Sequence, residues 1–338
     1  MLSSLVVLFI ARRHYPVGHL HQVLSSFYVA LRNDPFCDLQ CCCRMVREEI
    51  LCTDRFTSAV VPKHMTDIEN FQRSPVASDR SSPCCTIPLT GISAVRYGEK
   101  YGFIGLYICA EEFRGNGHGT ALFRHALRHL EGRVVGLEAV EAQLTNYAKH
   151  GFVLAHNTIR FGGELAVDVP ATASLSPTAA GAEGNGVVTI QALTPENADL
   201  AEAYDEEKIP APRQEFTRVW LTTPGHIARV AIEDGVVKGY GVLRPCVDGA
   251  KLAPLFASSV EVAELLARAL VAAAGAASRA SASSVKVFID VPEPNIEGVR
   301  MAERMGLSRF WVTGRMYLGP APKLPLDQTF GFTSLELG

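Results

Sequence analysis

Three glycines within five residues, led by an arginine, are the feature of the sequence that most clearly suggests chemistry. The stretch EEFRGNGHGTALFRHALRHL (111–130) contains Gly115, Gly117 and Gly119, with Arg114 directly before the first glycine. Glycine adopts positive φ angles at little cost, and it has no Cβ to hold a ligand away from the backbone. At the start of a helix, such a turn presents several N–H groups and the positive end of the helix dipole to one anion. We therefore expect a pyrophosphate-binding loop.

Three kinds of phosphate loop compete for this stretch. A Walker loop needs G-x-x-x-x-G-K-[ST], and no lysine follows the glycines here. A dinucleotide fingerprint needs G-x-G-x-x-G directly after a parallel strand, whereas here the glycines alternate behind the polar residues 110–114. The third pattern, R/Q-x-x-G-x-G/A, is satisfied by Arg114, Gly117 and Gly119.

The residues around the loop predict the elements that must position it, in the order β-β-α-β-α-β. Aromatic and branched residues favour strands before the loop, and apolar residues at helical spacing follow it until Gly132. The expected elements are strands over 91–98 and 101–109, a helix over 118–130, a strand over 134–140, a short helix over 142–150 that stops at Gly151, and one or two strands over 152–165.

A similar order of elements recurs in the second half, after a stretch of small residues, proline and glycine that predicts a flexible linker. Asn295 is the expected N-cap of the last helix and Gly306 its stop. The repeated order without shared sequence favours a duplicated fold. The expected elements are strands over 188–193, 227–246 (two, around the turn 233–235), 284–292 and 310–319, and helices over 195–207, 261–277 and 295–306.

Composition narrows the possible classes of protein. The chain has 338 residues, is 48% hydrophobic and carries a net charge of −3. A mildly acidic chain has no overall electrostatic reason to bind nucleic acid, and no stretch is long and apolar enough to span a bilayer. We expect a cytoplasmic protein with no nucleic acid or membrane partner.

The first 86 residues form an atypical, cysteine-rich segment. Seven of the nine cysteines lie before residue 90, and the run CDLQCCC (37–43) suggests zinc, with His14, His19 and His21 upstream, or palmitoylation. Neither pattern fits well, so free thiols in a reducing cytosol are favoured and no metal is expected. The apolar residues 5–11 suggest a buried or disordered start, with a targeting segment as the alternative. The segment lacks clean periodicity, so partial disorder is a second interpretation of it.

The stretches YICAEEFRGNGHGTALFRHAL, GLEAV and NYAKHGF together resemble the GNAT acetyltransferases, over residues 91–161. The second half resembles GNAT proteins that carry a second, divergent acetyltransferase-like domain. It lacks R/Q-x-x-G-x-G/A, and PLFASSVEVAELL (254–266) takes its place, which puts cofactor binding there in doubt. The resemblance implies an α/β fold of tandem GNAT-like (acyl-CoA N-acyltransferase) domains, each a mixed, mostly antiparallel sheet flanked by helices. The expected parts are the N-terminal segment 1–86, an acetyl-CoA-binding domain over 87–168, the linker 169–186 and a divergent domain over 187–338.

The resemblance also implies a mechanism. Acetyl-CoA, as co-substrate, would lie in a wedge between the parallel strands 103–109 and 134–140, and an amine would attack its thioester directly. Tyr147 stands at the position of the family's general acid, and Glu138 is the candidate base. The implied cofactor contacts are Tyr107, Ile108 and Cys109 for the pantetheine arm, and Arg114, Gly115, Asn116, Gly117, His118, Gly119 and Thr120 for the pyrophosphate.

Alternatives stay open at this point. Tyr147 could simply pack its helix on the sheet, and Glu138 could be a solvated carboxylate at the end of a strand. In the second half, Asp290, Glu293 and Asn295 are candidate acceptor contacts or an ordinary turn with a helix cap. The protein as a whole is expected to be an N-acetyltransferase for an unidentified small-molecule or peptide amine. The alternative is an acetyl-CoA-binding or regulatory protein with weak or no catalysis.

Overall fold

The computed structural model describes residues 4–14, 50–53, 56–60, 86–109, 111, 114–167, 174–175, 187–277 and 283–338. The cysteine run 37–43, with its zinc and lipid hypotheses, lies outside these residues, as does most of the predicted linker. The domain boundaries therefore stay a prediction.

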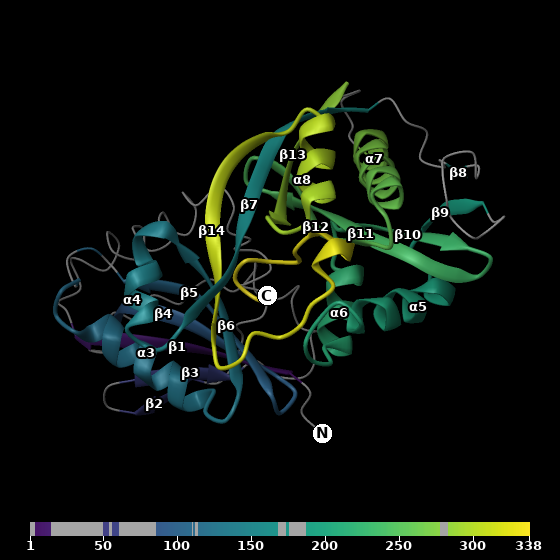
Figure 1. The fold of residues 1–338 in the computed structure, drawn as a ribbon. Coiled ribbons are helices and arrows are strands. Elements are labelled where there is room, and N and C mark those ends of the chain that lie inside the picture. The colour runs from purple at the N-terminus through teal and green to yellow at the C-terminus, as the bar shows by residue number, and fades with distance from the viewer. Residues whose placement is uncertain are drawn as a thin grey trace, which may run out of the picture.

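One long mixed sheet runs through the whole described part of the chain, and helices cover it (Figure 1). Its strand order is β2-β3-β1-β4-β5-β6-β14-β7-β13-β12-β11-β10-β9-β8, with β15 paired to β12. Only the β5–β6 and β12–β13 pairs are parallel among the described strands. The predicted mixed, mostly antiparallel sheet flanked by helices is thereby confirmed.

The first half of the chain supplies the strands β1 (Ser4–His14), β2 (Ile50–Thr53), β3 (Phe56–Val60), β4 (Thr86–Tyr97), β5 (Tyr101–Cys109), β6 (Val134–Val140) and β7 (Val153–Ala166). Its helices are α3 (His118–His129), the short η4 (Glu141–Gln143) and α4 (Leu144–Ala148). The strands β5 and β6 have the predicted bounds. The stretch after Gly151 forms one long strand.

The second half supplies the strands β8 (Ser174–Leu175), β9 (Val188–Ala192), β10 (Ile227–Glu233), β11 (Val236–Cys246), β12 (Gly249–Ala257), β13 (Ser284–Pro292), β14 (Ser308–Leu318) and β15 (Thr329–Gly331). Its helices are α5 (Pro195–Glu206), α6 (Gln214–Thr222), α7 (Val260–Ala277), α8 (Ile296–Arg304) and the short η5 (Leu326–Gln328). The sequence analysis did not predict α6, β12 or β15. It placed the cap of α8 correctly, because the Asn295 side chain accepts a hydrogen bond from the Gly298 amide at 2.8 Å.

The two halves are interlaced through their long strands. From the second half, β14 inserts between β6 and β7 of the first and is antiparallel to both. On its other edge, β7 pairs with β13. The curved ribbons of β7 and β14 therefore run side by side from one half to the other (Figure 1). Each half thus completes part of the sheet of the other.

Core residues of the first half form separate hydrophobic clusters on the two faces of the sheet. In the first half, α3 packs on one face with Ile104, Leu137 and their neighbours. Because side chains alternate along a strand, Phe103 points to the opposite face, where it packs with Tyr97 and Leu337. The residues after β15 (332–338) therefore cover the face that α3 leaves open.

Candidate functional site

The parallel strands β5 and β6 separate and leave a wedge between them. Their pairing ends at Ile104 and Leu137, although both strands continue. Directly beyond, Leu106 has a φ of 50°, which is rare for a residue other than glycine. The register between β4 and β5 shifts at the same level. Residues in such conformations cost about 1–3 kcal/mol and cluster at functional sites. Nothing in the sequence signalled the strain at Leu106.

The glycine-rich turn lies at the carboxyl end of β5 and leads into α3. Gly115 and Gly117 have φ angles of 77° and 79°, and an added Cβ at either position would meet nothing within 4 Å. These two glycines are therefore required by the backbone conformation, and the space beside them is open. Arg114 is exposed, and its Nε donates to the Cys109 carbonyl oxygen at 3.0 Å.

The start of α3 has the properties of an anion site. Gly117 is its N-cap, no side chain caps the helix, and the first turn contains no acidic residue. The first helical bond runs from the Ala121 amide to the Gly117 carbonyl at 3.0 Å. The amides of His118, Gly119 and Thr120 precede that bond and have no acceptor within the helix. They are the donors that a bound pyrophosphate would use.

Gly119 has a different reason to be glycine. Its added Cβ would lie 2.6 Å from the Tyr107 hydroxyl oxygen, so a side chain at this position would push α3 away from β5. The close contact fixes the height of the loop over the strand. The third glycine of the motif is therefore a packing requirement in this chain, and the Tyr107 side chain sets the spacing between α3 and β5.

Tyr147 lies on α4 beside the wedge and is half-buried. Its ring centre lies 5.6 Å from that of Phe123 and 6.2 Å from that of Phe152, and Phe123 also packs on Tyr107. Burial, with a smaller contribution from Tyr107, raises the pKa of Tyr147 to about 12. The hydroxyl therefore keeps its proton at neutral pH, as a general acid requires. The same contacts also pack α4 on the sheet, so both interpretations of this residue remain compatible with its position.

Glu138 is held by three donors. Its Oε1 accepts from Arg315 Nε at 2.7 Å and from Thr158 Oγ1 at 3.0 Å, and its Oε2 accepts from Thr313 Oγ1 at 2.8 Å. The Glu138 and Arg315 side chains are each 2% exposed. Burial lowers the pKa of Arg315, but the Glu138 carboxylate, together with Tyr317 and Tyr101, raises it overall, so the guanidinium stays charged. Both carboxylate oxygens are thus engaged at the place where β14 inserts, and the base assignment stays a prediction.

The second half has a corresponding wedge, but the chain itself fills it. The parallel pairing of β12 and β13 ends at Leu252 and Ile289. In the space beyond, β15 pairs antiparallel with β12, and the Phe332 amide donates to the Asp290 carbonyl of β13 at 2.9 Å. An added Cβ on Gly331 would lie 3.0 Å from the Ile289 side chain. A backbone segment therefore bridges the two strands where a pantetheine arm would otherwise lie.

The candidate acceptor contacts of the second half serve structural roles. Asp290 is fully buried and pairs with Arg160 Nε at 2.6 Å and with Lys251 Nζ at 2.5 Å. Although burial favours the neutral acid, the two cations hold the pKa of Asp290 below its ordinary range. Asn295 caps α8, and Glu293 is exposed and accepts from Asn157 at 2.8 Å.

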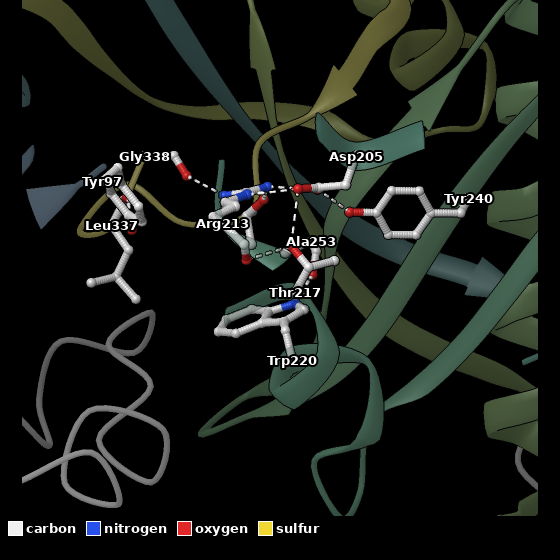
Figure 2. Close-up of polar contacts among 10 residues, drawn as sticks. Tyr97, Asp205, Arg213, Thr217, Trp220, Tyr240, Ala253, Leu337 and Gly338 are labelled. Carbon is white, nitrogen blue, oxygen red and sulfur yellow. Dashed lines mark hydrogen bonds and ion pairs between the residues drawn. The ribbon is translucent and has the colours of Figure 1, made fainter. Parts of the chain in front are cut away.

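Another buried ion pair, between Arg213 and Asp205, anchors the residues that follow β15. Arg213 donates to both carboxylate oxygens of Asp205, at 2.8 Å each, to Thr333 Oγ1 at 2.8 Å and to the Gly338 carbonyl at 3.3 Å. Figure 2 shows this guanidinium between Asp205 on one side and Gly338 on the other. The Tyr97 hydroxyl, from β4, donates to the Leu337 carbonyl at 2.7 Å. Residues 332–338, which we call the tail, are thus tied to both halves.

Two structural absences hold for the part of the chain that the structure describes. No three His, Cys, Asp or Glu side chains gather there as they would around a metal ion. Within the same residues, no helix is long and apolar enough to cross a membrane.

Comparison with known proteins gives consistent results for both halves. A profile described as "Acetyltransferase (GNAT) family" matches residues 76–154, and one described as "Acetyltransferase (GNAT) domain" matches residues 201–331. The chain is 31% identical over 255 residues to the holothin acyltransferase of Pseudoalteromonas sp. (strain SANK 73390). This alignment covers 74% of this chain and 78% of that protein. Among solved structures, a candidate acetyltransferase of Pyrococcus horikoshii superposes with a TM-score of 0.60 at 17% identity, over 100% of this chain and 97% of that one. At this identity, the structural likeness shows the fold alone.

Proposed function

Given that the chain belongs to the GNAT acyltransferases, with two domains of that family in tandem, we propose that it moves an acetyl group from acetyl-CoA to an amine. The observation that carries this proposal is the open wedge beside Leu106, with the uncapped start of α3 at its mouth. The wedge suits an extended thioester arm, and the helix start suits a pyrophosphate.

The proposed contacts follow the order of groups along acetyl-CoA. Backbone groups of residues 107–109 would hold the pantetheine arm and polarise the thioester carbonyl, as an oxyanion hole does. The amides of residues 115–120 would bind the pyrophosphate, and Arg114 would add positive charge. The exposed turn and the positive φ angles of Gly115 and Gly117 support this arrangement.

In the proposed chemistry, the amine nitrogen attacks the acetyl carbon directly, so no side chain forms a covalent intermediate. The C–S bond breaks, and Tyr147 gives its proton to the departing thiolate. The nitrogen loses its surplus proton as it becomes the amide nitrogen, which restores the Tyr147 hydroxyl. The raised pKa of Tyr147 supports this role. The second half would bind no acyl-CoA, because β15 fills its wedge. One acetyl-CoA per chain is therefore expected.

The nature of the acceptor is open to direct test. The relative named holothin acyltransferase supports holothin as the first acceptor to try, beside a panel of small and peptide amines. Titration calorimetry with acetyl-CoA measures donor binding, and release of free CoA thiol in the presence of each acceptor measures transfer. Binding with thiol release supports the proposal. Binding without release from any acceptor would favour the regulatory alternative, and no binding would refute the donor assignment.

A further inference from the structure

An amine that attacks a thioester must lose a proton, and a nearby carboxylate is a suitable acceptor for it. On the face of the sheet opposite α3, several described carboxylates are already neutralised. Glu138 is paired with Arg315, Asp290 with Arg160 and Lys251, and Asp205 with Arg213. These side chains are engaged by buried cations and hold strands and helices together.

Glu336, in the tail, is different. It is half-buried, and its Oε2 accepts a short hydrogen bond from the Ser334 hydroxyl. No ion pair with a lysine, arginine or histidine is found for it among the described residues. Its electrostatic neighbour is Lys251, which is already paired with Asp290 at 2.5 Å. Glu336 thus keeps a carboxylate that is held in place without being neutralised by direct contact.

The position of Glu336 relates it to the wedge. An added Cβ on Gly105 would lie 2.1 Å from the Glu336 carbonyl oxygen and 2.7 Å from its carbonyl carbon. Gly105 stands between Ile104, the last residue of β5 that pairs with β6, and the strained Leu106. The tail backbone therefore touches β5 at the level where the wedge opens, on the face opposite α3.

The tail is fixed on both sides of Glu336. Before it, Thr333 accepts from Arg213 at 2.8 Å, and Ser334 Oγ accepts from the Glu336 amide at 3.1 Å. After it, the Leu337 carbonyl accepts from the Tyr97 hydroxyl at 2.7 Å. A side chain placed on a segment with this many anchors has a defined location, which a catalytic group requires.

We propose that Glu336 receives the ammonium group of the acceptor and takes its proton, so that the acceptor approaches β5 from the tail side. This inference rests on the function proposed above. The proton passes from the ammonium to the Glu336 carboxylate, and the freed nitrogen forms the bond to the acetyl carbon. The C–S bond then breaks, and the thiolate takes its proton from Tyr147. As the nitrogen becomes the amide nitrogen, its second surplus proton restores the Tyr147 hydroxyl, and Glu336 releases its proton to solvent. The second half of the protein thereby contributes a reacting group to the site of the first.

The test compares Glu336→Gln and Glu336→Asp with the full-length wild type. Glu303→Gln is the matched control, because Glu303 is an exposed carboxylate that pairs with Arg309 on the surface. We expect all variants to bind acetyl-CoA as the wild type does. With holothin and benzylamine as acceptors, kcat/KM should fall about 100-fold or more in Glu336→Gln, since general-base catalysis contributes about 10²–10⁴-fold. Glu336→Asp should restore part of the rate, and Glu303→Gln should keep all of it.

The pH dependence separates a proton acceptor from a structural residue. Without Glu336, only amine that is already neutral in solution can react. The rate of Glu336→Gln should therefore rise about tenfold per pH unit below the pKa of the amine. In the wild type the rise should be shallower. Wild-type kcat/KM in Glu336→Gln, or an equal loss in Glu303→Gln, or a loss with the wild-type pH profile, would overturn the assignment. Failure of the wild type to bind acetyl-CoA or to acetylate either amine would instead refute the proposed function, and this inference with it.

Discussion

Gly117→Val isolates the contribution of the phosphate loop. Gly117 has a φ of 79°, and its added Cβ would meet nothing within 4 Å, so valine causes backbone strain there without a clash. A left-handed conformation costs a residue with a Cβ about 1–2 kcal/mol, and more if the Cβ is branched. The loop should relieve this strain by rotating its peptides, which turns the amides at the start of α3 away from the pyrophosphate.

The expected loss of affinity follows from the number of amides displaced. A hydrogen bond to a charged group contributes about 1.5–3 kcal/mol, so losing about two of them weakens binding by about 3 kcal/mol at the least. Since 1.4 kcal/mol corresponds to a factor of ten, the acetyl-CoA dissociation constant should rise about 100-fold. Titration calorimetry measures this change directly.

Gly132→Val is the matched control. Gly132 also has a φ of 79°, also has nothing within 4 Å of its added Cβ, and follows the other end of the same helix. It should cost similar stability and leave acetyl-CoA affinity unchanged. Acetyl-pantetheine, which lacks the pyrophosphate, should bind equally to both variants and to the wild type. Equal losses of acetyl-CoA affinity in the two variants, or a change of less than threefold in Gly117→Val, would refute the assignment of this loop to the pyrophosphate.

Three further outcomes are expected. Tyr147→Phe should lower kcat about 10–100-fold and leave the affinity for acetyl-CoA unchanged. The loss of kcat should shrink above pH 8.5, about the pKa of a free thiol, because the CoA thiolate then leaves without a proton. A wild-type rate over this whole pH range would mean that Tyr147 is only a packing residue. Calorimetry on the full chain should give one acetyl-CoA per molecule, because β15 occupies the second wedge; two sites would contradict this. Burial, with smaller contributions from Arg96 and Arg133, lowers the pKa of His129 from 6.5 to about 4 in the folded protein. As the pH falls from 6.5 to 4, the imidazole therefore takes up a proton in the unfolded chain before it does so in the folded protein, and the free energy of unfolding should fall. Because His129 is partly exposed, His129→Gln should remove about 1–2 kcal/mol of this fall in the free energy of unfolding, as measured by denaturant titration at several pH values. An unchanged pH dependence of stability in His129→Gln would contradict this prediction.

The sequence predicted the elements whose own residues determine them. The strand 101–109 is a run of aromatic and branched residues, the strand 134–140 is rich in valine, and the cap at Asn295 is a local contact. What it missed depends on distant partners. The short helix α6 is held by Arg213 and by Trp220, whose Nε1 donates to the Ala253 carbonyl at 2.8 Å. The three residues of β15 form a strand only because the β12–β13 wedge surrounds them.

In the candidate site, too, the sequence predicted the features that depend on local residues and missed those that depend on distant ones. The glycine spacing predicted the loop, because the need for positive φ is local. The environment of Glu138 could not be predicted from the sequence, because its partner Arg315 lies 177 residues further along the chain. The positive φ of Leu106 likewise lies where the β5–β6 pairing ends and the β4–β5 register shifts, and these pairings involve strands that the residue type of Leu106 does not reveal.

Because β14 inserts next to β6, the sheet of the first half can be completed only after β14 has been synthesised. A ribosome makes the loop, α3 and β6 long before β14, and domains usually begin to fold as they emerge. Here the edge of β6 stays unpaired until residues 313–318, its partners in β14, have been made. An exposed strand edge invites pairing with other chains. Newly made chains should therefore carry a vulnerable edge until β14 has been made, and a product that stops before β14 would keep it.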